Sequence, residues 1–225
     1  MNAQILPFAA AVPPALVARY QIHRYPATLI DVRTLHDGAR LTLRPVLPQD
    51  AELIAELIAR LSPAGRRNRF HGAVQISADQ VQRMSCVDYD RELAFVVTAR
   101  EAGVERVIAD ARYCVDEGAG PDGARGAEFA LMVDERWQRR GLGGWAMAAL
   151  RDAARAAGLH WLHGEVLSSN LPMLGLMRCC GLCCTPDLAD DRLVQVQERL
   201  GVGGQPTPRC ASRSALRQLQ NWIAR

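Results

Sequence analysis

A glycine-rich turn constrains the fold of this chain more than any other feature: it reads Gln138-Arg139-Arg140-Gly141-Leu142-Gly143-Gly144. The strand-like residues 128–133 precede it, and an Ala-rich stretch with apolar residues at helical spacing follows it and ends near Gly158. The first N–H groups of such a helix have no partner within the helix, and its dipole makes this end positive. Glycines let the backbone approach a ligand closely, and the two arginines add charge. The turn is therefore predicted to bind an anion such as the pyrophosphate of a cofactor.

Two well-known phosphate-binding motifs do not match this turn. A P-loop needs Gly-Lys-Ser or Gly-Lys-Thr at the start of the helix, and neither is present. The dinucleotide fingerprint needs Gly-x-Gly-x-x-Gly, which the spacing from Gly141 does not give. The pattern that remains is Gln-x-x-Gly-x-Gly. A turn that serves only close packing at a helix start is the structural alternative.

Strand and helix patterns alternate over most of the chain. Strands are predicted at residues 40–45, 93–99, 104–115, 128–133, 161–167 and 192–200, and helices at 51–61, 77–84, 142–154 and 170–180. Glu101-Ala102-Gly103 is typical of the turn of an antiparallel hairpin. We predict one domain over residues 37–200, with an N-terminal arm (1–36) before it and a linker with an amphipathic C-terminal helix (201–225) after it.

The composition narrows the possible functions. Apolar residues make up 49% and charged residues 23% of the 225, which suits a protein with a buried core. The net charge of +3 arises from 27 basic and 24 acidic residues spread along the chain, so no nucleic-acid partner is predicted. Three prolines interrupt the apolar opening segment, and no basic region precedes it. We therefore predict no signal peptide and no membrane association, with a cytoplasmic location as the default.

Four of the seven cysteines crowd into Cys179-Cys180-Gly181-Leu182-Cys183-Cys184, unlike the spaced cysteines of a secreted disulfide scaffold. We interpret them as reduced thiols. Cys180 and Cys183 have the spacing of half a zinc site, but His160 and His163 do not form a standard second pair. Small apolar thiols packed under a helix end are the favoured interpretation, and no metal site is predicted.

With these motifs in place, the chain resembles the GNAT superfamily, whose signature is Gln/Arg-x-x-Gly-x-Gly/Ala after a strand like Leu131-Met132-Val133. Other segments extend the similarity: Arg44-Pro45, Asp50-Ala51, Asn170 and Gly181-Leu182. Residues 23–183 more narrowly resemble the acetyltransferase domain of bacterial Pat-type protein lysine acetyltransferases, through Tyr25-Pro26, Asp37-Gly38, Leu61-Ser62-Pro63, Arg69-Phe70, Asp88-Tyr89-Asp90-Arg91-Glu92 and Gly164-Glu165-Val166-Leu167. The resemblance implies an α/β fold with a mixed, mainly antiparallel sheet, splayed near residues 128–133, and helices on both faces.

The resemblance also implies roles for single residues toward acetyl-CoA. Leu131, Met132 and Val133 would pair through backbone groups with the pantetheine arm. The turn residues would hold the pyrophosphate: Gln138, Arg139, Arg140, Gly141, Leu142, Gly143 and Gly144. Asn170 would contact the cofactor near the thioester, and the backbone N–H of Val133 could polarise the thioester carbonyl.

Glu128 lies three residues before Leu131, where many members of the family carry a general base. A substrate ammonium with a reference pKa of about 10.4 must lose a proton before it can attack a thioester. Without the resemblance, Glu128 would be interpreted as a solvated strand residue. Met177 occupies the position of a tyrosine that protonates the leaving thiolate in many members, so no general acid is assigned.

We therefore predict an N-acetyltransferase that moves an acetyl group directly from acetyl-CoA to an amine, with a protein lysine side chain as the first choice of acceptor. A small-molecule amine is the alternative acceptor, and a non-catalytic acyl-CoA-binding regulator is the alternative class. His71, after the basic loop 66–69, could line the acceptor site or be a solvated loop residue. The C-terminal helix could dock on its own domain or form a homodimer.

Overall fold

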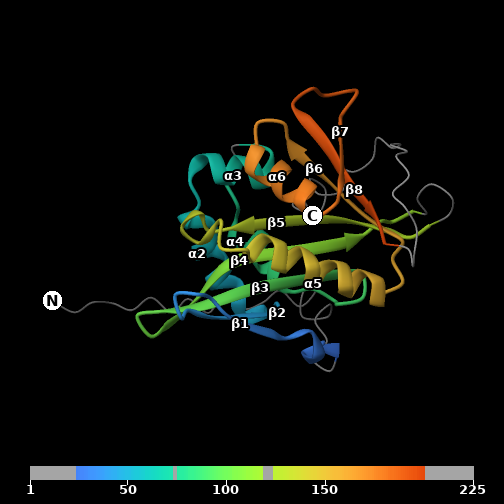
Figure 1. Ribbon diagram of the computed structural model, residues 1–225. Helices are drawn as coiled ribbons and strands as arrows, with labels where there is room; N and C mark the ends of the chain where they lie inside the picture. Colours follow the sequence, from blue (N-terminus) through green and yellow to red (C-terminus); the bar gives the residue numbers. More distant parts are fainter. Residues whose placement is uncertain (1–23, 73–74, 119–123, 201–225) are drawn as a thin grey trace.

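The computed structural model describes residues 24–72, 75–118 and 124–200, which form one eight-stranded sheet with helices on both faces (Figure 1). The strands are β1 (Asp31–Thr34), β2 (Arg40–Pro45), β3 (Glu92–Glu101), β4 (Val104–Val115), β5 (Gly126–Val133), β6 (Trp161–Leu167), β7 (Cys183–Pro186) and β8 (Leu193–Arg199). The helices are α2 (Ala51–Arg60), α3 (Pro63–Phe70), α4 (Ala78–Ser85), α5 (Leu142–Ala156) and α6 (Leu171–Cys179). The predicted α/β fold is confirmed.

The sheet has the strand order β1-β2-β3-β4-β5-β6-β8-β7, and every neighbouring pair is antiparallel except β5 and β6. The parallel pairing is short, because it joins residues 126–128 of β5 to residues 161–163 of β6 and then stops. A Cβ on Gly164 would lie 3.0 Å from the carbonyl oxygen of Phe129, so a side chain at this position would press against β5 where the strands separate. The predicted splay of the sheet is therefore confirmed.

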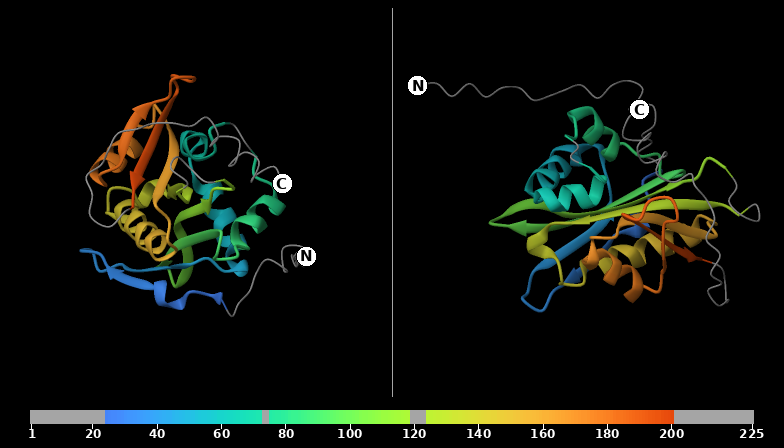
Figure 2. Two further views of the ribbon diagram at one scale, coloured as in Figure 1. Left: turned by 90° about the vertical axis from the view of Figure 1, so that its right-hand side faces the viewer. Right: turned by 90° about the horizontal axis from the view of Figure 1, so that it is seen from above.

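Alternation of side chains along the strands produces two hydrophobic cores, one on each face of the sheet. On one face Phe95 of β3 packs in a cluster with residues of α5 and α6. On the other face Val96 and Met132 pack in a cluster with residues of α2 and α4. Figure 2 shows these two helical layers on opposite sides of the sheet. The central strands are consequently buried on both faces.

Local sequence signals account for most element boundaries. Ser77 and Gln80 form the predicted capping box at the start of α4. The β3–β4 hairpin turns at Ala102 and Gly103, both with positive φ. Gly158, with φ +70°, directly follows the last turn of α5, as predicted for a helix C-terminus. The closing strand predicted at residues 192–200 is β8.

Three elements differ from the sequence predictions. Residues 66–69 were predicted as a loop but lie in α3, because Ser62 caps a new helix by accepting a hydrogen bond from the Gly65 N–H at 3.0 Å and Pro63 occupies its first turn. β1 lies within the segment assigned to an N-terminal arm, and it pairs with β2 as an edge strand. β7 is an unpredicted short edge strand. The predicted C-terminal helix lies outside the described residues.

Candidate active site

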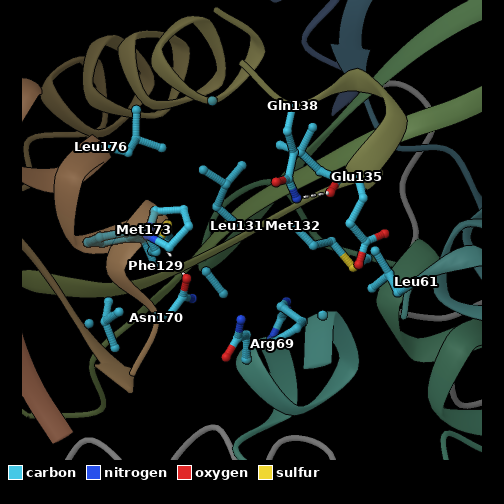
Figure 3. Close-up of a pocket in the computed structure, with 18 of the residues that line it drawn as sticks. Leu61, Arg69, Phe129, Leu131, Met132, Glu135, Gln138, Asn170, Met173 and Leu176 are labelled. Carbon is cyan, nitrogen blue, oxygen red and sulfur yellow. Dashed lines mark hydrogen bonds between the residues drawn. The ribbon is translucent and has the colours of Figure 1, made fainter. Parts of the chain in front are cut away.

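A cavity of about 490 Å³ opens where β5 and β6 separate. The start of α5 and α6 line one half of it, which we call the α5 half, and α3 with the facing side chains of β5 and β6 lines the other, which we call the α3 half (Figure 3). Every residue that the sequence singled out for cofactor binding or catalysis lines this cavity, except Arg140. The fold therefore brings together segments more than forty residues apart.

The α5 half is shaped by the backbone of the glycine-rich turn. Arg139 and Gly141 have left-handed conformations, with φ of +60° and +85°, which turn the chain into the helix beginning at Leu142. The first amides of α5 have no partners within the helix and sit at its positive end. A Cβ on Gly143 would lie 2.7 Å from a methyl group of Leu176, so glycine lets Leu176 of α6 pack close to the start of α5. These features suit a phosphate-bearing ligand.

The two arginines of the turn differ in direction. The Arg140 guanidinium donates to the Asp37 carboxylate at 2.7 Å and lies over the Trp137 ring, 4.9 Å from its centroid. Arg139 lines the cavity. Arg139 is therefore the arginine of the turn that borders the cavity, whereas the Arg140 guanidinium is engaged by Asp37; the predicted role of Arg140 in cofactor binding stays a prediction.

The free edge of β5 supplies backbone groups to the cavity. Asp134 donates its N–H to the carbonyl of Ile108 on β4 at 2.9 Å, and the β4–β5 ladder is regular. Alternate residues of an antiparallel ladder direct their backbone groups to opposite edges, so Met132 faces β4 whereas Leu131 and Val133 face the edge that β6 has left. The hydrogen bond that the Val133 carbonyl accepts from Gln138 Nε2 at 3.0 Å is consistent with this direction, because the carbonyl points away from β4. Leu131 and Val133 therefore offer backbone groups, and Met132 offers a side chain.

Asn170 begins α6 and borders the cavity. Its Oδ1 accepts a hydrogen bond from the Met173 N–H at 3.3 Å, as a helix N-cap does. Pro172 is accommodated in the first turn. The side-chain amide nitrogen of Asn170 is the group that remains to contact a ligand.

Glu128 lies on β5 in the α3 half and is 6% exposed. Burial raises the pKa of its carboxyl to about 8, and the nearby carboxylates Glu165 and Asp116 add to the rise, whereas Arg69 opposes it. A carboxyl with such a pKa is close to the range suited to proton transfer near neutral pH. Glu128 is therefore a buried, titratable group that faces the cavity, and the solvated interpretation is wrong.

Helix α3, which the sequence analysis missed, provides the opposite wall. His71 ends this helix in a left-handed conformation, and its ring is hydrogen-bonded to the backbone of Glu165 on β6. Burial is the main cause that lowers the pKa of His71. The start of α3 is tied to the segment between β5 and α5, because Glu135 Oε1 accepts from the N–H and hydroxyl of Ser62 at 3.0 and 2.8 Å. The Ser62-Pro63 pair, read as a cap and first turn, was the signal for this helix.

Met177, at the position of the family tyrosine, is fully buried in the α5-side core and does not line the cavity. Among the described residues that line the cavity there is no tyrosine. Within residues 24–72, 75–118 and 124–200, no group of three or more His, Cys, Asp or Glu side chains is arranged to hold a metal ion. No helix in the described part of the chain is long and apolar enough to cross a bilayer.

A helix start that attracts phosphates, an open strand edge and a buried carboxylate together define a site that can hold a phosphate-bearing acyl carrier beside a proton acceptor. Comparison with known families agrees: the family described as "Acetyltransferase (GNAT) domain" matches residues 40–182. This chain belongs to the GNAT acetyltransferase family.

Two proteins named as acetyltransferases are similar to this chain over about three quarters of its length. The acetyltransferase PA5475 of Pseudomonas aeruginosa is 31% identical over 174 residues, which cover 76% of this chain and 89% of the relative. The acetyltransferase Pat of Mycolicibacterium smegmatis is 33% identical over 175 residues, 77% of this chain but 46% of Pat. The chain therefore spans about half the length of that relative.

Solved structures share the fold. The GNAT domain of S. lividans PAT superposes with a TM-score of 0.67 at 25% identity, covering 78% of this chain and 99% of that domain. The structure of yncA from Salmonella typhimurium, solved with its cofactor acetyl-CoA, has a TM-score of 0.56 at 18% identity and covers 74% of this chain and 98% of that protein. Acetyl-CoA is accordingly the acyl donor associated with this family.

Proposed function

We propose that this protein transfers the acetyl group of acetyl-CoA directly to an amine, and that the acceptor is the side chain of a protein lysine. The observation that carries the proposal is the burial of Glu128, with a carboxyl pKa of about 8, in the same cavity as the start of α5. Similarity to proteins named Pat supports the choice of lysine. A small-molecule amine is the second choice of acceptor.

Acetyl-CoA, when bound, supplies a thioester that an amine can attack. The first amides of α5 and the Arg139 guanidinium would hold its pyrophosphate. Leu131 and Val133 would pair with the pantetheine arm as an added strand does, because their backbone groups face the free edge of β5. The Val133 N–H would polarise the thioester carbonyl. Asn170 would contact the cofactor near the thioester through its amide nitrogen.

Glu128 would accept a proton from the acceptor ammonium, directly or through water. The freed lone pair of the amine forms the C–N bond as the C–S bond breaks, and the electron pair of that bond leaves on the sulfur of CoA. The nitrogen then releases its second proton through solvent to the CoA thiolate, which gives the neutral amide and CoA thiol. Such a thiol resembles cysteine, with a pKa of about 8.5, so its thiolate can leave without a protein acid. This agrees with the burial of Met177 outside the cavity.

The test is to incubate the protein with acetyl-CoA and a panel of lysine-containing proteins, peptides and small amines while following CoA release and acetyl incorporation. We expect acceptor-dependent release, with a higher kcat/KM for protein lysines than for small amines. A higher kcat/KM for a small amine would favour the second choice of acceptor. Tight binding of acetyl-CoA with no acceptor-dependent release would instead support a non-catalytic acyl-CoA-binding regulator. The cytoplasmic location and the homodimer stay predictions.

A further inference from the structure

A buried guanidinium faces the α3 half of the cavity. Arg69 lies on α3, is 7% exposed and lines the cavity (Figure 3). Its Nε and Nη2 atoms are fully buried and have no hydrogen-bond partner among the described residues. Burial lowers the pKa of Arg69 to about 10, well above neutral, so the group carries its charge at pH 7. A buried charge without hydrogen bonds is costly, which points to a ligand that supplies the missing acceptor.

A carboxylate of the same half also has an unused atom. Glu165 Oε1 accepts a hydrogen bond from Gln195 Nε2 at 2.8 Å, whereas its Oε2 is buried and has no partner among the described residues. Glu165 lines the cavity and is close enough to Glu128 to raise the pKa of that carboxyl. The α3 half therefore presents an unsatisfied cation-binding atom as well as an unsatisfied anion-binding group.

The described neighbours of Arg69 supply no acceptor to its Nε or Nη2 atoms. The nearby Asp110 is engaged by Arg112, whose Nε donates to Asp110 Oδ1 at 2.9 Å. Phe70 offers its ring, 5.0 Å from the Arg69 guanidinium carbon, which is a cation–π contact and not a hydrogen bond. The two free N–H directions of a guanidinium fit the two oxygens of a carboxylate.

We propose that the α3 half recognises an acceptor that carries both an amine and a carboxylate: Arg69 binds the carboxylate, and Glu165 with Glu128 binds the ammonium before it is deprotonated. This inference rests on the proposed function. The carboxylate could belong to a free amino acid or to an acidic side chain next to a protein lysine. Both sources share the same chemistry at Arg69.

Matched acceptors test the proposal. Lysine and cadaverine, which differ by the carboxylate, are compared as acceptors with acetyl-CoA, as are two peptides in which the target lysine is followed by Asp or by Asn. We expect kcat/KM to favour the carboxylate-bearing member by roughly 10- to 100-fold, as is typical of a hydrogen-bonded charge. A preference within the first pair alone indicates a free amino acid, and one within the peptide pair indicates a protein segment.

Variants of α3 show whether Arg69 causes the preference. Arg69→Gln should abolish it, and Arg69→Lys should retain part of it. Arg67, exposed on the same helix, gives the matched control Arg67→Gln, which should keep the ratio of the wild type. Glu165→Gln should raise KM for both members of a pair.

Three outcomes would overturn the inference. The first is a wild type that shows no preference within either pair, a result that does not depend on whether any variant folds. The second is a folded Arg69→Gln variant that keeps the preference. The third is an Arg69→Gln variant that keeps the acceptor preference and changes only the ratio of kcat/KM with succinyl-CoA to kcat/KM with acetyl-CoA. Arg69 would then bind a carboxylate of the acyl donor. CoA release with cadaverine in these cases would leave the proposed acetyl transfer standing, whereas no release with any amine would refute that function itself.

Discussion

The two halves of the cavity are built from different chemical groups. The α5 half uses backbone: the amides of a helix start, two left-handed turn residues and the free edge of β5. The α3 half uses ionisable side chains, Arg69, Glu128 and Glu165, which come from three separate elements. Backbone amides are present whatever the side chains are, whereas the charge and shape of the α3 half depend on which side chains occupy it. We therefore expect substitutions in the α5 half to affect acetyl-CoA affinity and substitutions in the α3 half to affect turnover and acceptor choice.

The strongest test of this contrast is Glu128→Gln. Loss of a general base should lower kcat by about 10²- to 10⁴-fold. Binding of acetyl-CoA, measured by calorimetry, should stay within a factor of about three, because the change lies in the α3 half. An unchanged kcat at saturating amine across the pH range would contradict the assignment of Glu128.

The same variant has a stability signature that distinguishes lost chemistry from lost folding. The folded state raises the pKa of Glu128 to about 8, so it binds more protons than the unfolded state between pH of about 4.5 and 8. The stability of the wild type should therefore fall as pH rises through this window. Glu128→Gln removes that loss and should melt at a higher temperature than the wild type at pH 9.

The pH dependence of turnover is the next prediction. Glu128 must be ionised to accept a proton, so kcat should rise about tenfold per pH unit below pH 8 and level off above it. Glu128→Gln should lose this inflection, and its residual rate should follow deprotonation of the amine itself. An inflection near pH 8 that persisted in the variant would belong to another group.

In the α5 half, a pair of glycines offers a test of comparable design. Gly141 has φ +85° and open space around its Cα, so Gly141→Ala should strain the turn by about 1–2 kcal/mol without a clash. Acetyl-CoA affinity should fall by up to about tenfold, while kcat at saturation changes little. Gly144 also has open space and no positive φ, and Gly144→Ala is the matched control, with an affinity close to that of the wild type. Equal losses in both variants would mean that crowding, and not backbone conformation, is responsible.

The same difference between the halves explains what could be predicted from the sequence. The turn residues of the α5 half are contiguous, and a turn between a strand and a helix determines its own geometry, so residues 138–144 could be located without a structure. The splay of the sheet was predicted from the family resemblance and not from any local pattern of residues. The α3 half depends on β5 and β6 meeting α3, a helix concealed by reading Ser62-Pro63 as the end of α2. The unsatisfied atoms of Arg69 and Glu165 depend on which groups surround them, and no local pattern reports that.

The smallest effect is expected from the arginines of the turn. Arg139 lines the cavity and Arg140 is paired with Asp37, although they are adjacent in the motif. Removing a partly exposed charge at a helix start changes anion binding by about 0.3–1 kcal/mol, so Arg139→Gln should raise the Kd for acetyl-CoA by roughly two- to fivefold. Arg140→Gln should leave this Kd unchanged. Because the charge lost is the same in both variants, a difference between them reports the direction of the side chain and not the net charge of the turn. High salt should reduce the effect of Arg139→Gln, since solvent screens exposed charges. An equal loss in both variants, removed by salt, would mean that the turn attracts the cofactor through its total charge alone.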